Sequence, residues 1–208
     1  MIRTRRRGFT YVEVLIAFSV MGVLGTIGSL NFQRAEKRAK HSEAITNLKS
    51  LHASLMSQST KPTSIHVPGF HPQRGNRYSY HLGPCTSCED RSGEHAEQHP
   101  NDDCIGADTY EHPTLPNLFS PVTLPGVSWE GDAARLMNVQ PGVYGTDTDW
   151  VYLAYAAGDL DDNPSDLADT WFVGSSDGLT YGICPASTES IQFVAGEPVQ
   201  VVRDSECN

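Results

Sequence analysis

MIRTRRRGFTYVEVLIAFSVMGVLGTIGSLNF, residues 1 to 32, is the stretch of this 208-residue chain that decides its fold. Four arginines precede an apolar run from Val12 to Leu30, and no small-residue signal-peptidase site follows it. A helix from Thr10 to Leu30 would be roughly 30 Å long, which is enough to cross a bilayer. By the positive-inside rule the arginines would stay in the cytoplasm, so we expect the bulk of the chain to lie outside the inner membrane.

The helix is expected to continue beyond the apolar run. The next apolar residues recur mostly every three or four positions, which is the pattern of an amphipathic helix with one buried stripe: Phe32, Ala35, Ala39, Ile45, Leu48, Leu51 and Leu55. No proline occurs before Pro62. The pattern therefore predicts one helix from near Phe9 to near Ser59.

Glu13 is a lone carboxylate near the start of the apolar run. A charge inside a membrane span costs several kcal/mol and usually has a specific partner. No lysine or arginine lies between Gly8 and Gln33. Cleavage after Gly8 would create a new amino group on Phe9, and a neighbouring subunit could place that cation against Glu13. Alternatively, Glu13 lies close enough to the end of the span to reach the lipid headgroups.

The segment RRRGFTYVEVLIAFSVMGVL resembles the class III signal of type IV pilins and type II secretion pseudopilins. It has a short basic leader ending in Gly8, Phe9 at the cut, and Glu13 as the fifth residue after the cut. The resemblance implies that a prepilin peptidase removes residues 1–8 and that Phe9 is N-methylated. It also implies that Glu13 pairs with the amino terminus of an adjacent subunit, Phe9, during filament assembly.

The remaining chain divides by composition into two parts of a globular head, residues 61–208. Residues 61–117 are rich in Pro, Gly, His and Asn and predict a variable loop region, in which only RYSYHL has strand character. Residues 118–208 contain five short runs that predict antiparallel strands, at 150–158, 170–176, 179–183, 190–195 and 198–202. Asp177-Gly178 predicts a two-residue hairpin turn. The long helix is expected over residues 9–60. Packing the predicted sheet on its apolar stripe gives an α+β pilin fold.

The formal net charge is −10, with 15 basic and 25 acidic residues. Because residues 1–8 contain four arginines and no acid, the chain without them carries −14. Nucleic-acid binding depends on basic side chains that neutralise phosphates, so we expect no general nucleic-acid binding.

All five cysteines follow the apolar segment, in a distribution typical of an oxidising compartment: Cys85, Cys88, Cys104, Cys184 and Cys207. Cys184 and Cys207 flank the last two strands, and the family resemblance implies a disulfide between them. We expect Cys104 to pair with either Cys85 or Cys88, which leaves one thiol over. A zinc site could be drawn from these three cysteines with His95 and His99, although their spacing fits no standard finger.

The acidic loop GDLDDNPSDLAD supplies a dense set of oxygen ligands suited to calcium: Asp159, Asp161, Asp162, Asn163, Asp166 and Asp169. It departs from an EF-hand, because Pro164 replaces the turn glycine and Thr170 replaces the bidentate glutamate. Some pilin-like heads carry a calcium loop between strands. The alternative is a solvated acidic turn without a metal.

No nucleophile-elbow, phosphate-loop or metalloprotease motif is present in the sequence, and we expect no enzymatic activity. The resemblance implies a structural subunit of a type IV pilus, major or minor, that serves surface attachment or motility. Its expected partners are other copies of itself, other pilins, prepilin peptidase and the inner-membrane assembly platform. The alternatives are a pseudopilin of a type II secretion system and, more distantly, an inner-membrane-anchored metal-binding domain.

Overall fold

A computed structural model describes residues 9–119, 124–133, 138–160, 163, 167–183 and 190–204. For residues 26–31, 33, 34 and 132 it describes the backbone alone. Helix α1 runs from Tyr11 to Met56, slightly inside the predicted bounds. The chain forms two compact units, Met1–Ala39 and Lys40–Asn208, which we describe separately.

In the first unit, the part of α1 from Tyr11 to Gly25 is mostly apolar and exposed. Aromatic and aliphatic side chains that would normally seek burial are largely accessible, including Phe9, Phe18, Met21 and Leu24. Burying such side chains is worth about 1.5 to 3 kcal/mol each, so this surface has a strong tendency to associate with another apolar surface.

In the second unit, the same helix has one buried stripe that forms the core of the head. Ala44, Leu48, Leu51 and Leu55 are fully buried, at the spacing of one helix face. The predicted stripe also included Ile45, which is only partly buried at the edge of this core. Polar contacts accompany the stripe, because the Glu43 carboxylate accepts hydrogen bonds from the Tyr80 hydroxyl and from the backbone N–H groups of Arg77 and Tyr78.

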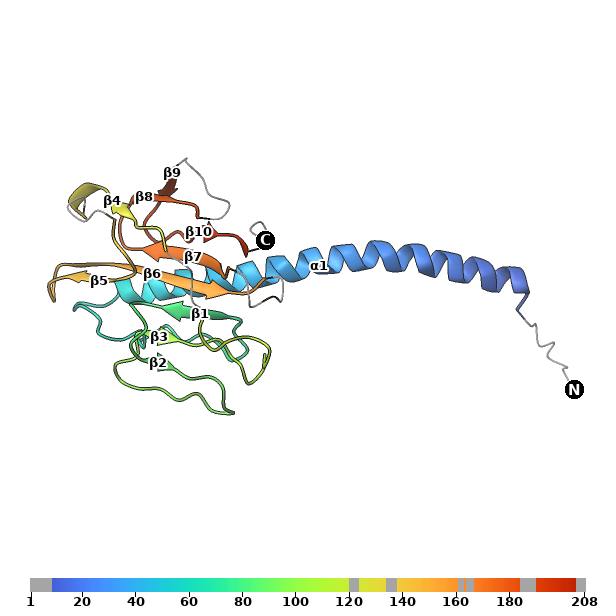
Figure 1. The fold of residues 1–208 in the computed structure, drawn as a ribbon, viewed down its shortest axis with the longest axis horizontal. Coiled ribbons are helices and arrows are strands. Elements are labelled where there is room, and N and C mark those ends of the chain that lie inside the picture. Colours follow the sequence, from blue (N-terminus) through green and yellow to red (C-terminus); the bar gives the residue numbers. More distant parts are fainter. Residues whose placement is uncertain are drawn as a thin grey trace, which may run out of the picture. The chain divides into compact units, whose positions relative to one another are not determined.

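The stripe packs against a seven-stranded sheet with the order β10-β7-β6-β1-β3-β2, in which β5 also pairs with β6 (Figure 1). The strands are β1 (Tyr78–His81), β2 (Cys88–Glu89), β3 (Cys104–Ile105), β5 (Gly142–Gly145), β6 (Trp150–Gly158), β7 (Asp169–Gly174) and β10 (Val199–Val202). All neighbours are antiparallel except β2 and β3. Inward side chains alternate along each strand, and those facing α1 include Tyr78, Tyr80, Tyr152, Ala154 and Val173.

The opposite face of the sheet is covered by a smaller antiparallel sheet and its connections. Its strands are β4 (Ser128–Trp129), β8 (Gly178–Tyr181) and β9 (Ser190–Phe193), in the order β4-β8-β9, with the 3₁₀ turn η1 (Gly131–Ala133) after β4. Trp129 and Phe193 meet edge to face and pack with Phe172 of β7 in a second core. The head therefore has three layers: helix, large sheet and small sheet.

The prediction of a hairpin at Asp177-Gly178 is wrong. Strand β8 leaves the large sheet and pairs with β4 and β9 instead of β7. Gly178 does not adopt a positive φ; a Cβ at this position would lie 2.4 Å from the Ser128 carbonyl oxygen. The glycine is needed for the close approach of β4 and β8 rather than for a turn.

The predicted α+β pilin fold is confirmed, and all five strands predicted in the carboxy-terminal part are present within two residues of the expected positions. The region 61–117 contributes more than a loop, because β1, β2 and β3 extend the large sheet. The short strands β4 and β5 were not predicted either.

Candidate functional site

The first turn of α1 places Thr10 and Glu13 in reciprocal contact. The Glu13 carboxylate accepts hydrogen bonds from the backbone N–H and the hydroxyl of Thr10, both at 2.8 Å. The Glu13 N–H donates to the Thr10 hydroxyl oxygen at 3.3 Å. This is a capping box, which satisfies backbone donors that have no partner within the helix.

A shallow groove of about 270 Å³ lies beside the Glu13 carboxylate on the same helix face. It is lined by Phe9, Glu13, Val14, Ala17, Phe18 and Met21. Phe9 is 88% exposed and Phe18 is 68% exposed, so large apolar side chains surround a single charged group. Such a surface can accept another apolar helix, provided that the carboxylate keeps or finds a hydrogen-bonding partner.

Among the described residues, we find no helix that combines the length and the hydropathy needed to span a bilayer.

The predicted assembly residues lie together at this end of the helix. Phe9 and Glu13 both line the groove, whereas Gly8, the predicted cleavage position, lies outside the described residues. Within the chain, Glu13 has Thr10 as its partner. The capping role of Thr10 was not anticipated, although the T-x-x-E spacing of residues 10 to 13 is the standard sequence signal for it.

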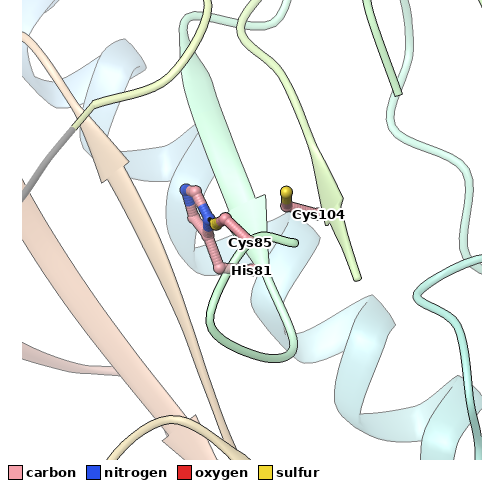
Figure 2. Close-up of side chains that lie close together, drawn as sticks. All are labelled: His81, Cys85 and Cys104. Atoms are coloured by element: carbon pink, nitrogen blue, oxygen red, sulfur yellow. Dashed lines mark hydrogen bonds between the residues drawn. The ribbon is translucent and has the colours of Figure 1, made fainter. Parts of the chain in front are cut away.

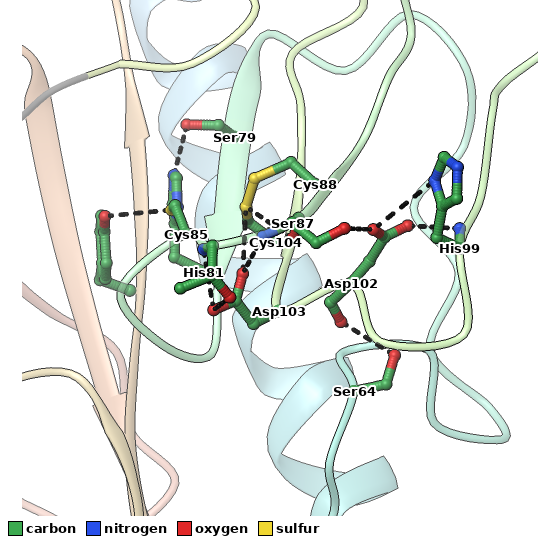
Figure 3. Close-up of a disulfide and its surroundings, with 12 residues drawn as sticks. Ser64, Ser79, His81, Cys85, Ser87, Cys88, His99, Asp102, Asp103 and Cys104 are labelled. Atoms are coloured by element: carbon green, nitrogen blue, oxygen red, sulfur yellow. Dashed lines mark hydrogen bonds and ion pairs between the residues drawn. A yellow bond between two sulfur atoms is a disulfide. The ribbon is translucent and has the colours of Figure 1, made fainter.

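A second cluster of chemically active side chains lies where β1, β3 and β2 meet. Cys88 and Cys104 form a disulfide, which is one of the two pairings that the sequence left open. Cys85 is a free thiol, half-buried beside His81 and Cys104 (Figure 2). Cys104 also contacts the Ser87 carbonyl and the Asp103 carboxylate, which continue the polar contacts around the disulfide (Figure 3).

The histidine in this cluster is His81, not the two that the zinc hypothesis used. His81 is buried in β1, stacks on Tyr155 at 4.1 Å, and lies beside the Cys85 thiol. His99 is largely exposed, and His95 does not belong to the groups of side chains close enough to share a metal ion among the described residues. Sequence spacing could not identify His81, because the sheet register brings it opposite Cys104.

The other predicted sites fall partly outside the described residues. Cys184 and Cys207 lie there, as do Asp161, Asp162 and Asp166 of the acidic loop. Asp169 is buried and its carboxylate accepts hydrogen bonds from Tyr78, Trp171 and Gln200. These donors occupy the oxygens that the calcium hypothesis assigned to the metal, while Asp159 accepts from the backbone N–H of Asn163. The carboxy-terminal disulfide and the calcium set stay predictions.

Comparison with known proteins gives a match to one family over the second part of α1 and much of the head. The family model for the type IV pilin PilA matches residues 34–167. The type IV major pilin protein PilA of Myxococcus xanthus (strain DK1622) is 39% identical over 93 residues, and the alignment covers 42% of this chain and 42% of that protein. The aligned stretch thus spans less than half of the relative's length.

Proposed function

This chain belongs to the type IV pilin PilA family, and on that basis we propose that it is a structural subunit of a type IV pilus, polymerised with other copies of itself and other pilins into an extracellular filament. The alignment with the pilin relative covers less than half of that protein. The filament role is therefore a proposal for this chain and is not taken over directly from the relative.

The observation that carries the proposal is the exposed apolar first part of α1. The head already has two cores, whereas large apolar side chains in the described part of the first unit are mostly exposed, among them Phe9, Phe18 and Leu24. Stacking such helices beside one another would bury these side chains, and the free energy of that burial would drive assembly.

The finer steps follow the family pattern and belong to the same proposal. Prepilin peptidase would remove residues 1–8 and Phe9 would be N-methylated; before assembly the apolar segment would hold the chain in the inner membrane at an assembly platform. The filament would serve surface attachment or motility. No cofactor is required for this role, and calcium in the acidic loop would act only on the stability of the head.

Glu13 would act in assembly by exchanging its partner. In the free chain its charge is satisfied by Thr10, so it is not left unpaired. In a filament, the amino group of Phe9 on an adjacent subunit would offer a full positive charge to the same carboxylate. A charge buried in an apolar bundle without its partner raises the free energy of the assembly. This contact would therefore set the axial register between subunits.

Two substitutions separate the assembly charge from the helix cap. Glu13→Gln removes the charge but keeps a capping-box side chain, because Gln serves at this position as well as Glu. Thr10→Ala removes the capping hydroxyl and keeps the carboxylate. We expect the Gln variant to be inserted and processed normally but to yield at least tenfold fewer sheared filaments, and the Ala variant to retain filaments.

The measurement is the amount of this chain in the sheared filament fraction relative to the cell-associated fraction. Normal filament levels in the Gln variant with a loss in the Ala variant would show that Glu13 acts only as a cap, and would refute the assembly ion pair. Absence of the wild-type chain from any sheared filament would refute the pilus function itself.

A further inference from the structure

A free thiol lies directly beside a disulfide in the head. Strand β3 lies between β1 and β2, and Cys104 is the register partner of His81 on one side and of Cys88 on the other. Register partners project from the same face of a sheet, so His81, Cys104 and Cys88 form one row across three strands. Tyr155 of β6 is the register partner of His81 and extends the row.

Cys85 reaches this row from the turn between β1 and β2. Its φ of 57° is in the left-handed region, which few residues other than glycine adopt, and the turn directs its thiol over β1 (Figure 2). The Cys85 sulfur, the Cys104 sulfur and a His81 ring nitrogen lie within 4.8 Å of one another. The free sulfur is therefore close to contact with one sulfur of the disulfide.

Hydrogen bonds around His81 define which ring nitrogen is free to accept a hydrogen bond. The Ser79 hydroxyl donates to the Ala157 carbonyl, so its oxygen accepts from the N–H at Nε2 of His81, at 2.7 Å. Burial lowers the pKa of His81 to about 3 and keeps the ring neutral. The lone pair of Nδ1 then faces the Cys85 thiol, which donates to it (Figure 3).

We propose that this cluster is a thiol–disulfide exchange site, in which Cys104 is shared between Cys88 and Cys85. The Cys85 thiol loses its proton to solvent, and its thiolate sulfur attacks the Cys104 sulfur. A Cys85–Cys104 bond forms as the Cys88–Cys104 bond breaks, and the electron pair leaves on the Cys88 sulfur, which takes up a proton from solvent. The step is an isomerisation and needs no oxidant or reductant.

The two pairings are closely balanced by chain connectivity. Cys88 and Cys104 are 16 residues apart, and Cys85 and Cys104 are 19 apart, so both bonds close loops of nearly equal entropy. Burial raises the pKa of the Cys85 thiol to about 11, so only a small fraction of it is thiolate at pH 8 and the exchange is slow. Exchange would move the free thiol from Cys85 to Cys88.

The test follows the free thiol in the full-length chain, purified without reductant. An aliquot is alkylated with iodoacetamide at once, and a second after several hours at pH 8. The sample is then reduced, the released thiols are blocked with N-ethylmaleimide, and trypsin releases residues 78–91 as one peptide carrying both Cys85 and Cys88. Tandem mass spectrometry assigns the iodoacetamide label between them. We expect label on Cys85 at first and at least a tenth of it on Cys88 after incubation; label confined to Cys85 after incubation would overturn the proposal.

Cys88→Ser tests whether the Cys85 sulfur can bond to the Cys104 sulfur, and the result does not depend on the rate of exchange. With Cys88 absent, we expect Cys85 and Cys104 to form a disulfide, so that both resist alkylation in the folded chain. Cys85→Ser is the matched control, and should keep the Cys88–Cys104 bond. A folded Cys88→Ser chain in which Cys85 and Cys104 are both alkylated would overturn the proposal.

Discussion

Single residues in the head are positioned by charge as well as by packing, and Asp108 is the clearest case. Its carboxylate is buried and accepts a paired hydrogen bond from the Arg74 guanidinium, along with the backbone N–H groups of Gly75 and Glu111. Burial alone would raise the pKa of Asp108, but these donors outweigh it and lower the pKa to about 2. The ionised form is thus favoured by the fold.

This shift predicts an acid-dependent loss of stability. A folded pKa below the unfolded value of about 3.8 stabilises the head at neutral pH, and that contribution is lost as the pH falls from about 4 to about 2. We expect Asp108→Asn to be less stable than the wild type by about 2 kcal/mol at pH 7 and by little at pH 2. Urea unfolding at both pH values checks this, with the exposed Glu94→Gln as control; an equal deficit at both pH values would contradict it.

Residue roles differed in how readily the sequence revealed them. The charge of Glu13 was visible because a carboxylate is rare in an apolar run, and its cap with Thr10 was equally visible in the T-x-x-E spacing but was not used. The role of His81 was not visible. It follows from the pairing of β1 with β3, residues 23 positions apart in the chain, and no local pattern encodes that register.

At the scale of elements, α1 shows two environments along one helix. Leu48 is fully buried against the large sheet, whereas Leu24 is 64% exposed in the first unit. Helix periodicity predicted the buried stripe because one face only is apolar there, and it predicted no orientation for the first part because every face is apolar.

The same substitution at these two positions should therefore have different effects. Leu48→Ala removes a buried side chain from a closed core and should destabilise the head by about 2 to 5 kcal/mol. Leu24→Ala should leave head stability unchanged and reduce the yield of sheared filaments. Thermal unfolding of the head and filament recovery measure the two effects; a melting temperature lowered equally by both variants would contradict the division between head and assembly surface.

Strand prediction succeeded for runs rich in aromatic and β-branched residues, and failed for the two-residue strands β2, β3 and β4 and for β5, which has a glycine at each end. Strand β6 was predicted at its observed bounds because Trp150–Gly158 is long, aromatic and bounded by turn residues. Strands β2 and β3 have two residues each and lie among Pro, Gly, Asp and Ser residues. They exist because β3 pairs with β1, a tertiary contact that composition does not report.

At the scale of the whole molecule, the proposed loss of residues 1–8 changes both the net charge of the chain and its amino terminus. It removes four arginines and takes the formal net charge from −10 to −14, and it creates the amino group that would meet Glu13. A subunit recovered from filaments should therefore have the mass of residues 9–208 plus one methyl group. Intact-mass spectrometry of sheared material checks this, and a chain that retains Met1 in filaments would contradict the processing step.

The disulfide between Cys88 and Cys104 turns the segment between them into a covalently closed ring attached to the sheet at its base. Residues 92–95 and 97–101 of this ring are exposed, and neither core cluster includes a residue of the segment. Lengthening an already closed loop costs little, about 0.6 kcal/mol for each doubling. A peptide epitope inserted between His95 and Ala96 should therefore leave the head folded, with one copy carried by each subunit.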